Sequence, residues 1–418
     1  MKQNAVVLGG SVAGLLAAAA LAPRYDTIEI IERDDLPYGP EARRGTPQGR
    51  HVHALLPRGL QAAEGLLPGL TDQLLAAGAL PGDVLGNARW YLNGRPLARR
   101  SIGLAALTAS RPLIEHTIRA AVRDLPNVTI TDGHDVVGLR AEAQGVRAVH
   151  ITSRYGHGSR VVPADLLVDA TGRGSRMPQW LAGLGFAAPA EDVVPIDVRY
   201  ASRIFEGDLL ADDRVVITAR YPGLRRSSVM QRLEGGRVLV TLAGVHGERP
   251  PADLDGFAAY AGSLPVPDTA KVIAGGTPVG DASTYHFPAY VRRRYESAAL
   301  PPGLLVIGDA ACAFNPVYGQ GMSTAAMSAE LLRADDDPAR FHAGQAELHE
   351  APWTLAVGAD LALDGRSTGG PAATIRAIQL AAVEDGDLAE AFIRVTSLVD
   401  PPRSLFAPWI AERLAATA

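Results

Sequence analysis

The sequence predicts an α/β fold in which a parallel, Rossmann-like sheet carries an inserted, mostly antiparallel sheet and is followed by C-terminal helices. Three observations lead to this prediction. A glycine-rich turn at 9–14 joins an apolar strand to an alanine-rich helix. A second buried strand with an acidic end lies far away at 304–309. Between them, the stretch 195–242 shows the alternating pattern of half-buried antiparallel strands.

The N-terminal turn, Gly9-Gly10-Ser11-Val12-Ala13-Gly14, has the form of a dinucleotide-binding fingerprint. It follows the apolar run 5–8 and precedes a helix expected over 15–21, which Pro23 ends. Gly9 permits the tight bend, and Gly14 lets helix and strand pack closely. Ser11 replaces the glycine that lets backbone approach a pyrophosphate, and its hydroxyl is a candidate donor to a phosphate oxygen. The helix start supplies free N–H groups and a positive dipole end for phosphates.

An acidic residue follows the second apolar run of the chain. Glu32 comes directly after 28–31, at the place where a carboxylate usually holds a ribose hydroxyl. This first half of the signal therefore predicts a dinucleotide but does not say which one.

The distant stretch 302–322 indicates which dinucleotide the chain binds. It contains a turn, the buried strand 304–307 and the acidic strand end Gly308-Asp309-Ala310. Phe314-Asn315-Pro316 and Gly319-Gln320-Gly321-Met322 follow, before a helix expected from about Ser323.

These stretches resemble the single-component flavoprotein monooxygenases of the para-hydroxybenzoate hydroxylase and squalene epoxidase type. Within that group the chain looks most similar to bacterial polyketide (polyether) epoxidases. The matching pieces keep the family's order over most of the first 330 residues. They are the 9–14 turn with Glu32, Arg44 to His53, Ser110-Arg111, Asp165 to Ser175, and Gly308 to Met322.

The resemblance implies FAD as the cofactor, held in a domain of the para-hydroxybenzoate hydroxylase type. It implies that the following residues contact FAD: Gly9, Ser11, Val12, Ala13, Gly14, Glu32, Arg33, Arg44, Arg50, Arg111, Asp169, Gly172, Gly308, Asp309, Gly321 and Met322. Asp169 and Gly172 stand apart here, whereas the family has an adjacent Asp-Gly pair, so the resemblance leaves their nicotinamide role open. His53, beside Leu55 and Leu56, is expected to be a structural histidine.

The resemblance also implies where the chemistry occurs. Pro316, Gly319, Gly321 and Met322 form the catalytic set near the reactive edge of the isoalloxazine. The N–H groups and dipole of the helix that starts there would stabilise the negative charge of reduced flavin. Apolar surroundings would protect a flavin hydroperoxide, formed with O2, from wasteful decay in water.

The rest of the chain fits this scheme in order. Helices are expected over 55–67, 70–77, 112–125 (with Ser110 as N-cap) and 255–264. A hairpin with an Asn93-Gly94 turn joins 88–92 to 95–98, and the short strands 128–130, 136–139, 146–152 and 160–162 suggest an antiparallel meander. An amphipathic helix is expected over 404–414. We therefore expect an FAD-binding domain of 1–86, 105–190 and 285–335, a substrate-binding sheet domain of 87–104 and 191–284, and a C-terminal helical region of 336–418.

The strand 196–205 is expected to roof the substrate cavity. Alternation places Val198 and Tyr200 on one face, and Asp197, Arg199 and Arg203 on the other. We expect the charged face to point outward, so that the substrate contacts are Val198, Tyr200, Phe314 and Asn315. Such an apolar pocket favours alkene epoxidation, because an isolated alkene has no proton to lose and needs no catalytic base.

The sequence therefore predicts an FAD-dependent monooxygenase, preferably an epoxidase of a lipophilic polyketide or terpenoid. NADPH or NADH, directly or through a reductase partner, would be the electron donor. An aromatic hydroxylase of the same family and a polyprenyl reductase-like flavoenzyme without oxygen chemistry remain alternatives. A flavin-binding protein without turnover is a weaker one, since Asp309, Gly319 and Gly321 are intact. A halogenase is disfavoured because neither Lys2 nor Lys271, the only lysines, is placed for it.

The amino-acid composition limits the kinds of partner and the cellular compartment that we expect. The formal charge of −5 over 418 residues disfavours a nucleic-acid surface. The single cysteine fits a reducing cytosol, and no apolar run reaches the roughly 20 residues of a membrane span. We expect a cytoplasmic monomer or homodimer that binds O2 and a lipophilic small molecule, with no metal site.

Overall fold

The computed structural model describes residues 2–142, 145–156, 158–366 and 370–417. Five parallel strands form one sheet in the order β17-β11-β1-β2-β7. They are β1 (Lys2–Leu8), β2 (Tyr25–Ile31), β7 (Val128–Thr131), β11 (Leu166–Asp169) and β17 (Leu304–Val306). Because β11 pairs with both β1 and β17, strand ends that lie far apart in the sequence meet at one edge of the sheet. This confirms the expected parallel, Rossmann-like sheet.

Helices cover one face of this sheet. They are α1 (Val12–Leu21), α2 (Pro57–Leu66), α3 (Leu70–Ala76), α4 (Arg111–Arg123) and α8 (Gly321–Ala334). Nine of the ten residues of α1 are buried, and four of them are alanines in sequence, 17–20. Their small side chains let α4 and α8 approach α1 closely, which places the start of α8 beside the start of α1.

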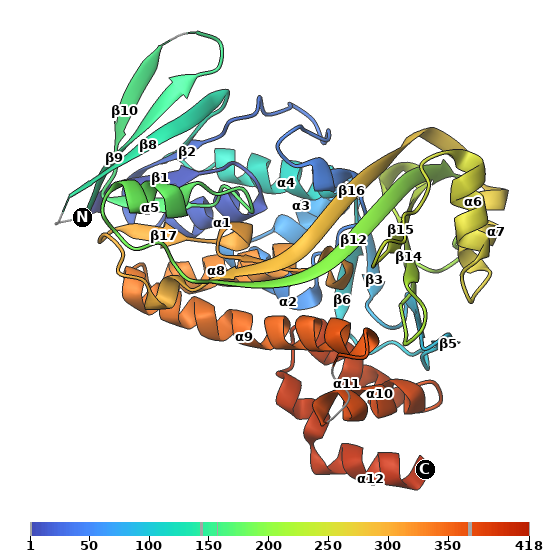
Figure 1. The fold of residues 1–418 in the computed structure, drawn as a ribbon. Helices are drawn as coiled ribbons and strands as arrows, with labels where there is room; N and C mark the ends of the chain where they lie inside the picture. The colour runs from blue at the N-terminus through green and yellow to red at the C-terminus, as the bar shows by residue number, and fades with distance from the viewer. Residues whose placement is uncertain (1, 143–144, 157, 367–369, 418) are drawn as a thin grey trace.

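The other face is covered by a three-stranded antiparallel sheet of β8 (His134–Glu142), β9 (Gly145–Ser153) and β10 (Ser159–Pro163), with α5 (Met177–Gly183) beside it. Figure 1 shows these three strands at the N-terminal end of the molecule, away from the C-terminal helices.

The second large sheet has eight strands in the order β18-β16-β12-β15-β14-β13-β4-β5. They are β4 (Ala88–Leu92), β5 (Arg95–Pro96), β12 (Glu191–Glu206), β13 (Val215–Thr218), β14 (Arg226–Arg232), β15 (Arg237–Gly244), β16 (Thr277–Arg293) and β18 (Cys312–Ala313). The long strands β12 and β16 run together from the parallel sheet to the far end of this one (Figure 1). A separate antiparallel pair is formed by β3 (Leu80–Asp83) and β6 (Ala105–Thr108), and Trp90 on β4 donates to the carbonyl of Val84, directly after β3, at 3.1 Å.

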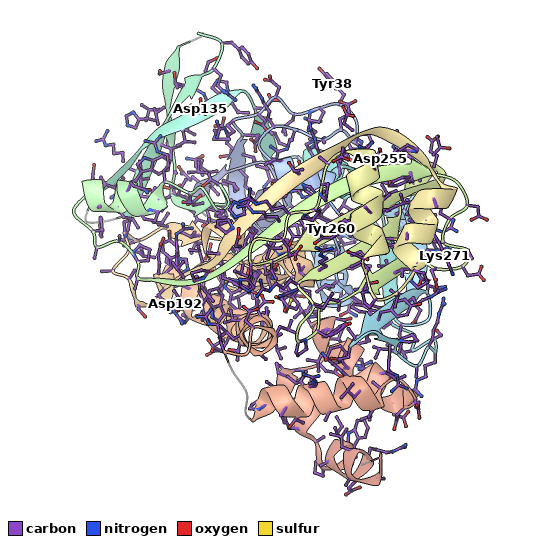
Figure 2. All side chains as sticks on the ribbon, turned by 45° about the vertical axis from the view of Figure 1, so that its right-hand side comes forward. Tyr38, Asp135, Asp192, Asp255, Tyr260 and Lys271 are labelled. Carbon is purple, nitrogen blue, oxygen red and sulfur yellow. The ribbon has the colours of Figure 1, made fainter. Side chains whose placement is uncertain are left out.

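Two helices cover the outer side of the second sheet. α6 (Leu254–Gly262) and α7 (Asp268–Gly275) pack on β12, β14 and β15 through a shared core that includes Phe205, Met230 and Phe257. The Tyr260 hydroxyl on α6 donates to the carbonyl of Ala243 on β15, 3.0 Å away. Figure 2 shows this helix pair on the outside of the strands, with Lys271 exposed on α7. Lys271 therefore lies on the outer side of the second sheet.

The C-terminal helices close the remaining side. α9 (Pro338–Leu363) runs along the underside of both sheets, and α10 (Pro371–Ala381), α11 (Gly386–Thr396) and α12 (Pro408–Thr417) follow (Figure 1). α10 and α11 share a core with the β4–β5 hairpin, including Leu92, Leu97, Ile378 and Phe392. In the described part of the chain, no helix combines the length and apolarity that a membrane crossing requires.

Several local predictions were right. The Asn93-Gly94 turn has the two positive φ angles, 51° and 75°, that a tight hairpin requires. The Ser110 side chain caps α4 by accepting from the N–H of Leu113 at 3.2 Å.

The short 3₁₀ turns lie at Pro47–Arg50, Glu234–Gly236, Tyr295–Ser297, Gly308–Ala310, Pro316–Tyr318 and Pro402–Phe406.

Other local predictions were wrong. The strand expected at 128–130 as part of a meander is β7, which pairs in parallel with β2 at the sheet edge. Helices α5 and α7 were missed, because each is short and begins next to a proline. The helix expected over 404–414 is divided into a 3₁₀ turn and α12, with Pro408 beginning the second segment.

Candidate active site

The two halves of the fingerprint meet at the start of α1. Gly9 has φ of 101°, and a β-carbon there would lie 2.5 Å from the carbonyl oxygen of Ala170. A β-carbon on Gly14 would lie 1.8 Å from the carbonyl oxygen of Gly9, so only glycine lets helix and strand pack this closely. Gly308, with φ of 65°, lies against the first turn of α1, where its β-carbon would be 2.8 Å from Cβ of Ala13. The turn after β17 therefore packs against the Ala13 side chain.

Glu32 lies at the end of β2, beside this turn, and is 4% exposed. Its carboxylate accepts the N–H groups of Gly10 at 2.6 Å and Asp34 at 2.9 Å. Arg43 forms an ion pair with Glu32 at 3.2 Å and another with Asp34 at 3.0 Å. Glu32 is thus held in place at the end of β2, with Arg43 as its counter-ion.

Arg43 is a residue that the sequence reasoning passed over in favour of its neighbour. Its guanidinium is buried among Glu32, Asp34 and Glu115, which outweigh the effect of burial and raise its pKa. Its Nη2 atom has no partner among the described residues. Arg44 and Arg50 are exposed, and the Arg33 side chain is 64% exposed, forming an ion pair with Asp135 at 3.9 Å. Arg33 therefore points away from the cradle, and the predicted FAD contacts of Arg44 and Arg50 stay predictions.

Ser11 does not have the free hydroxyl that the sequence suggested. Its Oγ donates to Glu115 at 2.8 Å and accepts from Nη2 of Arg111 at 2.8 Å. Its proton is therefore already used, which corrects the idea of a direct hydroxyl–phosphate bond. Glu115 also pairs with Nη1 of Arg111 at 3.0 Å and with Nε of Arg43 at 2.7 Å. Although burial raises it, Arg111 and Arg43 hold the pKa of Glu115 below its usual range.

Asp309 faces the start of α8. Its Oδ1 lies 3.7 Å from the place where a β-carbon on Gly321 would be. Burial raises the pKa of Asp309, and the positive charges of Arg111 and Arg173 counteract this. Arg111 is itself buried, so the carboxylate and the guanidinium face the same interior region, between the two helix starts. The structure brings Arg111, Asp309 and Gly321 together, and their contacts with FAD stay predictions.

Asp169 has a different task from the one expected. Its side chain is fully buried, and it accepts hydrogen bonds from Thr171 N at 2.9 Å, from Thr171 Oγ1 at 2.6 Å and from Ser175 Oγ. The carboxylate therefore shapes the 169–175 turn, in which Gly172 has φ of 79°. Any contact of this turn with a cofactor falls to its backbone and to neighbouring side chains.

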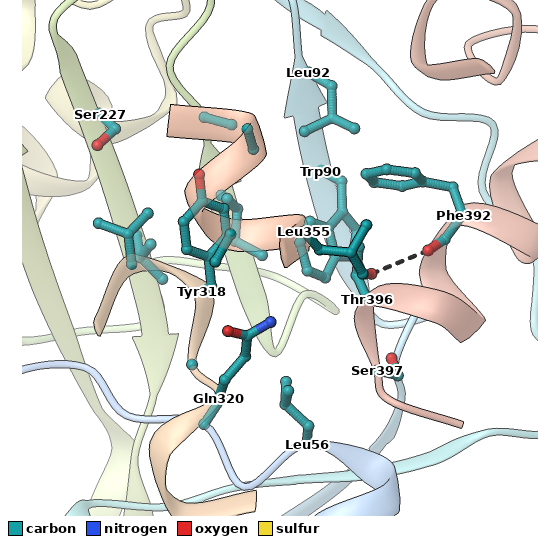
Figure 3. Close-up of a pocket in the computed structure, with 18 of the residues that line it drawn as sticks. Leu56, Trp90, Leu92, Ser227, Tyr318, Gln320, Leu355, Phe392, Thr396 and Ser397 are labelled. Carbon is teal, nitrogen blue, oxygen red and sulfur yellow. Dashed lines mark hydrogen bonds between the residues drawn. The ribbon is translucent and has the colours of Figure 1, made fainter. Parts of the chain in front are cut away.

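A cavity of about 1270 Å³ opens where the two sheets and the C-terminal helices meet. Its walls come from 48–57, from β4, β6, β13 and β14, and from α9, α10 and α11, and they are mostly apolar. Figure 3 shows Tyr318 and Gln320 opposite Trp90, Leu355 and Phe392 across this space. Pro316 to Gln320, the stretch that leads from Asp309 to α8, is part of the wall. The cavity therefore reaches the fingerprint at the residues expected to lie by the reactive edge.

Asp360 anchors this stretch from α9. Its buried carboxylate accepts from Asn315 Nδ2 at 2.9 Å, from the Tyr318 hydroxyl at 2.9 Å, and from Tyr290 and Arg220. Asn315 in turn caps the Pro316–Tyr318 turn by accepting from Val317 N at 3.1 Å. A single carboxylate thus fixes the turn relative to β16 and α9. Asp360 lies outside the motifs, so nothing in the sequence marked it.

The predicted substrate residues divide into two groups. Tyr200 lines the cavity, and its hydroxyl donates to Asn315 Oδ1 at 3.4 Å. Val198 and Phe314 lie in the aromatic core behind the wall, together with Phe287 and Trp353. Asn315 is fully buried and acts through the turn that it caps.

The charged face of β12 only partly points outward. Asp197 sits in a β-bulge with φ of 48°, and its carboxylate pairs with His286 at 2.8 Å on the surface, as expected. Arg203 is 8% exposed and donates to the carbonyls of Gly280 at 2.6 Å and Ala252 at 3.0 Å. The expectation that Arg203 faces solvent was wrong, because chain segments near α6 and β16 cover this part of the sheet.

His51 is the other residue that the sequence analysis did not single out. It lies in the cavity wall, 5% exposed, with ring centroids 5.9 Å from Tyr200 and 5.8 Å from Tyr285. Burial, with help from Arg50, lowers its pKa to about 4. His53 binds the carbonyl of His51 through Nδ1 at 3.0 Å, in agreement with a structural role.

The cradle fits FAD. Two glycines without room for side chains, the start of α1, the buried Glu32 and an orphaned guanidinium NH2 on Arg43 together suit a pyrophosphate and a ribose. A family model described as "FAD binding domain" matches residues 2–334. The chain belongs to this FAD-binding family. It is an FAD-dependent oxidoreductase of the flavoprotein monooxygenase group.

Individual relatives agree with this family. The chain is 35% identical to protein Rv3254 of Mycobacterium tuberculosis, over 79% of this chain and 72% of that protein. It is 25% identical to kynurenine 3-monooxygenase of Salinispora tropica, over 78% of this chain and 70% of that enzyme. Among solved structures, a flavoprotein/dehydrogenase from Cytophaga hutchinsonii superposes with a TM-score of 0.73 over 100% of both chains at 14% identity, which shows a common fold.

Proposed function

We propose that this protein is an FAD-dependent monooxygenase that inserts one oxygen atom of O2 into a bulky, lipophilic natural-product substrate, preferably by epoxidising an alkene of a polyketide or terpenoid. The observation that carries the proposal is the shared wall at Pro316 to Gln320, which belongs both to the FAD fingerprint and to the large apolar cavity. Ligand pockets for drug-sized molecules are about 300–1,000 Å³, so a cavity of about 1270 Å³ suits a larger molecule than one aromatic ring.

Bound FAD would supply the redox chemistry, receiving two electrons from NADPH, NADH or a reductase partner and activating O2. One oxygen atom goes to the substrate and the other leaves as water. The chain's own contribution begins at α8, whose first N–H groups, at Gly321 and Met322, favour negative charge at the helix start. Asp360 holds the adjoining turn, so that the substrate and the reactive edge keep one geometry.

The tyrosine and histidine side chains at this wall are neutral at physiological pH. Burial and the charge of Asp360 raise the pKa of Tyr200 and of Tyr318 well above the usual value. His51 is deprotonated, since its pKa is about 4. Asp360 itself is occupied by donors from Arg220, Asn315, Tyr290 and Tyr318. Because these donors engage Asp360, it is not free to take a proton from the substrate, and this suits an alkene, which has no proton to give up.

Aromatic hydroxylation is the second candidate. The ring cluster of His51, Tyr200 and Tyr285 would accept a planar substrate, and the relative from Salinispora tropica is named kynurenine 3-monooxygenase. A reductase without oxygen chemistry remains the third reading, because the same cavity would hold a polyprenyl chain.

One experiment separates the three. The FAD-loaded protein is supplied with NADPH or NADH under ¹⁸O2 and offered two probe mixtures, long-chain alkenyl ketones and alkylphenols. A product heavier by one ¹⁸O atom in the alkenyl series supports epoxidation, and one in the phenol series supports hydroxylation. A product saturated at the alkene in the absence of O2 would contradict the monooxygenase proposal.

A further inference from the structure

His51 sits at the end of a hydrogen-bonded chain of hydroxyl groups. The N–H of Val52 donates to Thr241 Oγ1 at 3.1 Å. Thr241 Oγ1 lies 2.6 Å from Ser202 Oγ, which lies 2.7 Å from His51 Nδ1. The three side chains belong to β15, β12 and the loop before α2, so that two strands of the second sheet hold the ring in place.

The protons of the two hydroxyl groups have two consistent directions, because Thr241 Oγ1 keeps a second lone pair after it accepts from Val52. In one of them Thr241 donates to Ser202, and Ser202 donates to Nδ1 of His51. A neutral imidazole that accepts at Nδ1 carries its proton on Nε2. In this arrangement His51 presents an N–H donor from the edge of the ring opposite Ser202.

The Nε2 atom of His51 is buried and makes no hydrogen bond. His51 is only 5% exposed, and Nε2 has no partner in the described ranges of the chain. A buried polar group without a partner is unfavourable, and this one differs from others in the fold because its ring lines a cavity from which a ligand could satisfy it. The ring lines the substrate cavity, and its centroid lies 5.9 Å from that of Tyr200 and 5.8 Å from that of Tyr285, which are themselves 6.4 Å apart.

We infer that His51 is a specificity-determining residue whose Nε2–H binds an acceptor oxygen, such as a ketone carbonyl, on the lipophilic substrate. Tyr200 and Tyr285 pack against the planar group that carries this oxygen. The inference rests on the proposed function and deepens it, because it selects an oxygenated substrate of the polyketide type over a pure hydrocarbon terpenoid. A hydrocarbon would fill the same cavity but leave the donor unsatisfied.

The test measures binding of two fluorescent probes to the FAD-loaded protein. One is a dimethylaminonaphthalene dye with a propionyl group, and the other is the same dye with its carbonyl replaced by methylene. The wild type should bind the ketone about tenfold more tightly than its carbonyl-free analogue. His51→Leu should abolish the preference and keep its FAD, whereas His51→Gln, which retains an amide donor, should keep part of it. His150→Leu, which makes the same substitution at an exposed histidine of β9 outside the cavity wall, is the matched control and should behave as the wild type.

The outcomes separate this inference from the proposed function. Equal binding of the two dyes by the wild type, an unchanged preference in His51→Leu, or loss of FAD from that variant would overturn the role of His51. Failure of the FAD-loaded wild type to bind either dye would also refute the lipophilic cavity on which the proposed function depends.

A second measurement tests the direction of the hydroxyl chain. In protein with ¹⁵N-labelled histidine, the His51 ring, assigned by its loss in His51→Gln, should show the pattern of a neutral imidazole protonated at Nε2. Ser202→Ala should allow the other tautomer to appear. A neutral ring protonated at Nδ1 in the wild type would contradict the inference.

Discussion

Gly308 and Ala13, which are 295 positions apart in the sequence, are in contact, and a β-carbon on Gly308 would lie 2.8 Å from Cβ of Ala13. This contact joins the turn before Asp309 to the first turn of α1, the two parts of the FAD cradle. Gly308→Ala must therefore both strain a backbone with φ of 65° and separate the two parts.

We expect Gly308→Ala to lose about tenfold or more in FAD affinity, in addition to about 1 kcal/mol of stability. Gly185→Ala is the control, since Gly185 also has a positive φ, of 86°, but a β-carbon there meets open space. Fluorescence titration of the apoproteins with FAD measures the FAD affinity of the two variants. Equal FAD affinity in the two variants would show that the contact is not important for the cradle.

Glu32 holds Gly10 and Arg43 in addition to its predicted contact with the ribose. Removing a charged hydrogen bond to the adenosine ribose should weaken FAD binding by about 1.5–3 kcal/mol in Glu32→Ala. The same change also frees Gly10 N and one contact of Arg43, so Glu32→Gln, which keeps an acceptor oxygen, is the matched variant. Isothermal titration should place Glu32→Gln between the wild type and Glu32→Ala. If both variants bind FAD as tightly as the wild type, Glu32 serves only to hold Gly10 and Arg43.

Stability should fall as the pH is lowered below neutrality. Burial lowers the pKa of His342 to about 4, whereas an unfolded histidine has a pKa near 6.5. The unfolded chain thus binds the proton first, and stability present above about pH 6.5 is lost down to about pH 4, at up to about 1.4 kcal/mol per pH unit.

The variant His342→Phe isolates this contribution. His342 packs against Phe341 and Tyr295, away from the cavity wall, so phenylalanine should be accommodated. Urea unfolding of the FAD-loaded proteins at pH 7 and pH 5 should show a smaller loss of stability in the variant. Equal losses would mean that His342 does not titrate as its burial requires.

Two substitutions on β12 distinguish epoxidation from base-assisted hydroxylation. Asp197 is on the surface with His286, so Asp197→Asn should leave turnover nearly unchanged. Tyr200 lines the cavity, so Tyr200→Ala should change substrate affinity or the position oxidised. Product analysis with the ¹⁸O2 assay checks both, and a large loss of the chemical step in Asp197→Asn with FAD still bound would favour a hydroxylase.

The motifs predicted the backbone elements of the cradle, because the geometry of a strand–turn–helix unit is encoded within a few residues, whereas the contacts with FAD stay predictions. Gly9, Gly14, Gly308 and the helix start of α8 lie where the sequence placed them. The partners of these motifs were not predictable, because they depend on which distant side chains the fold brings together. Glu115 uses the hydroxyl of Ser11, and Asp360 reaches back from α9 to the turn at Asn315.

The alternation of polar and apolar residues within a single strand predicted burial less well, because distant segments of the chain decide which face is covered. Alternation along β12 placed Asp197 correctly but failed for Arg203, because further chain covers both faces of this sheet. His51 appeared in the sequence as one of several polar residues in a loop. Only its contacts with Ser202, Tyr200 and Tyr285 distinguish it from His53.

The central claim is that the two-part cradle binds FAD, and the absorbance spectrum of the purified protein tests it most directly. We predict about one FAD per chain, released on denaturation and therefore non-covalent, and a folded Asp309→Ala variant that has lost most of it. A wild-type protein that is colourless and does not bind added FAD would contradict the account.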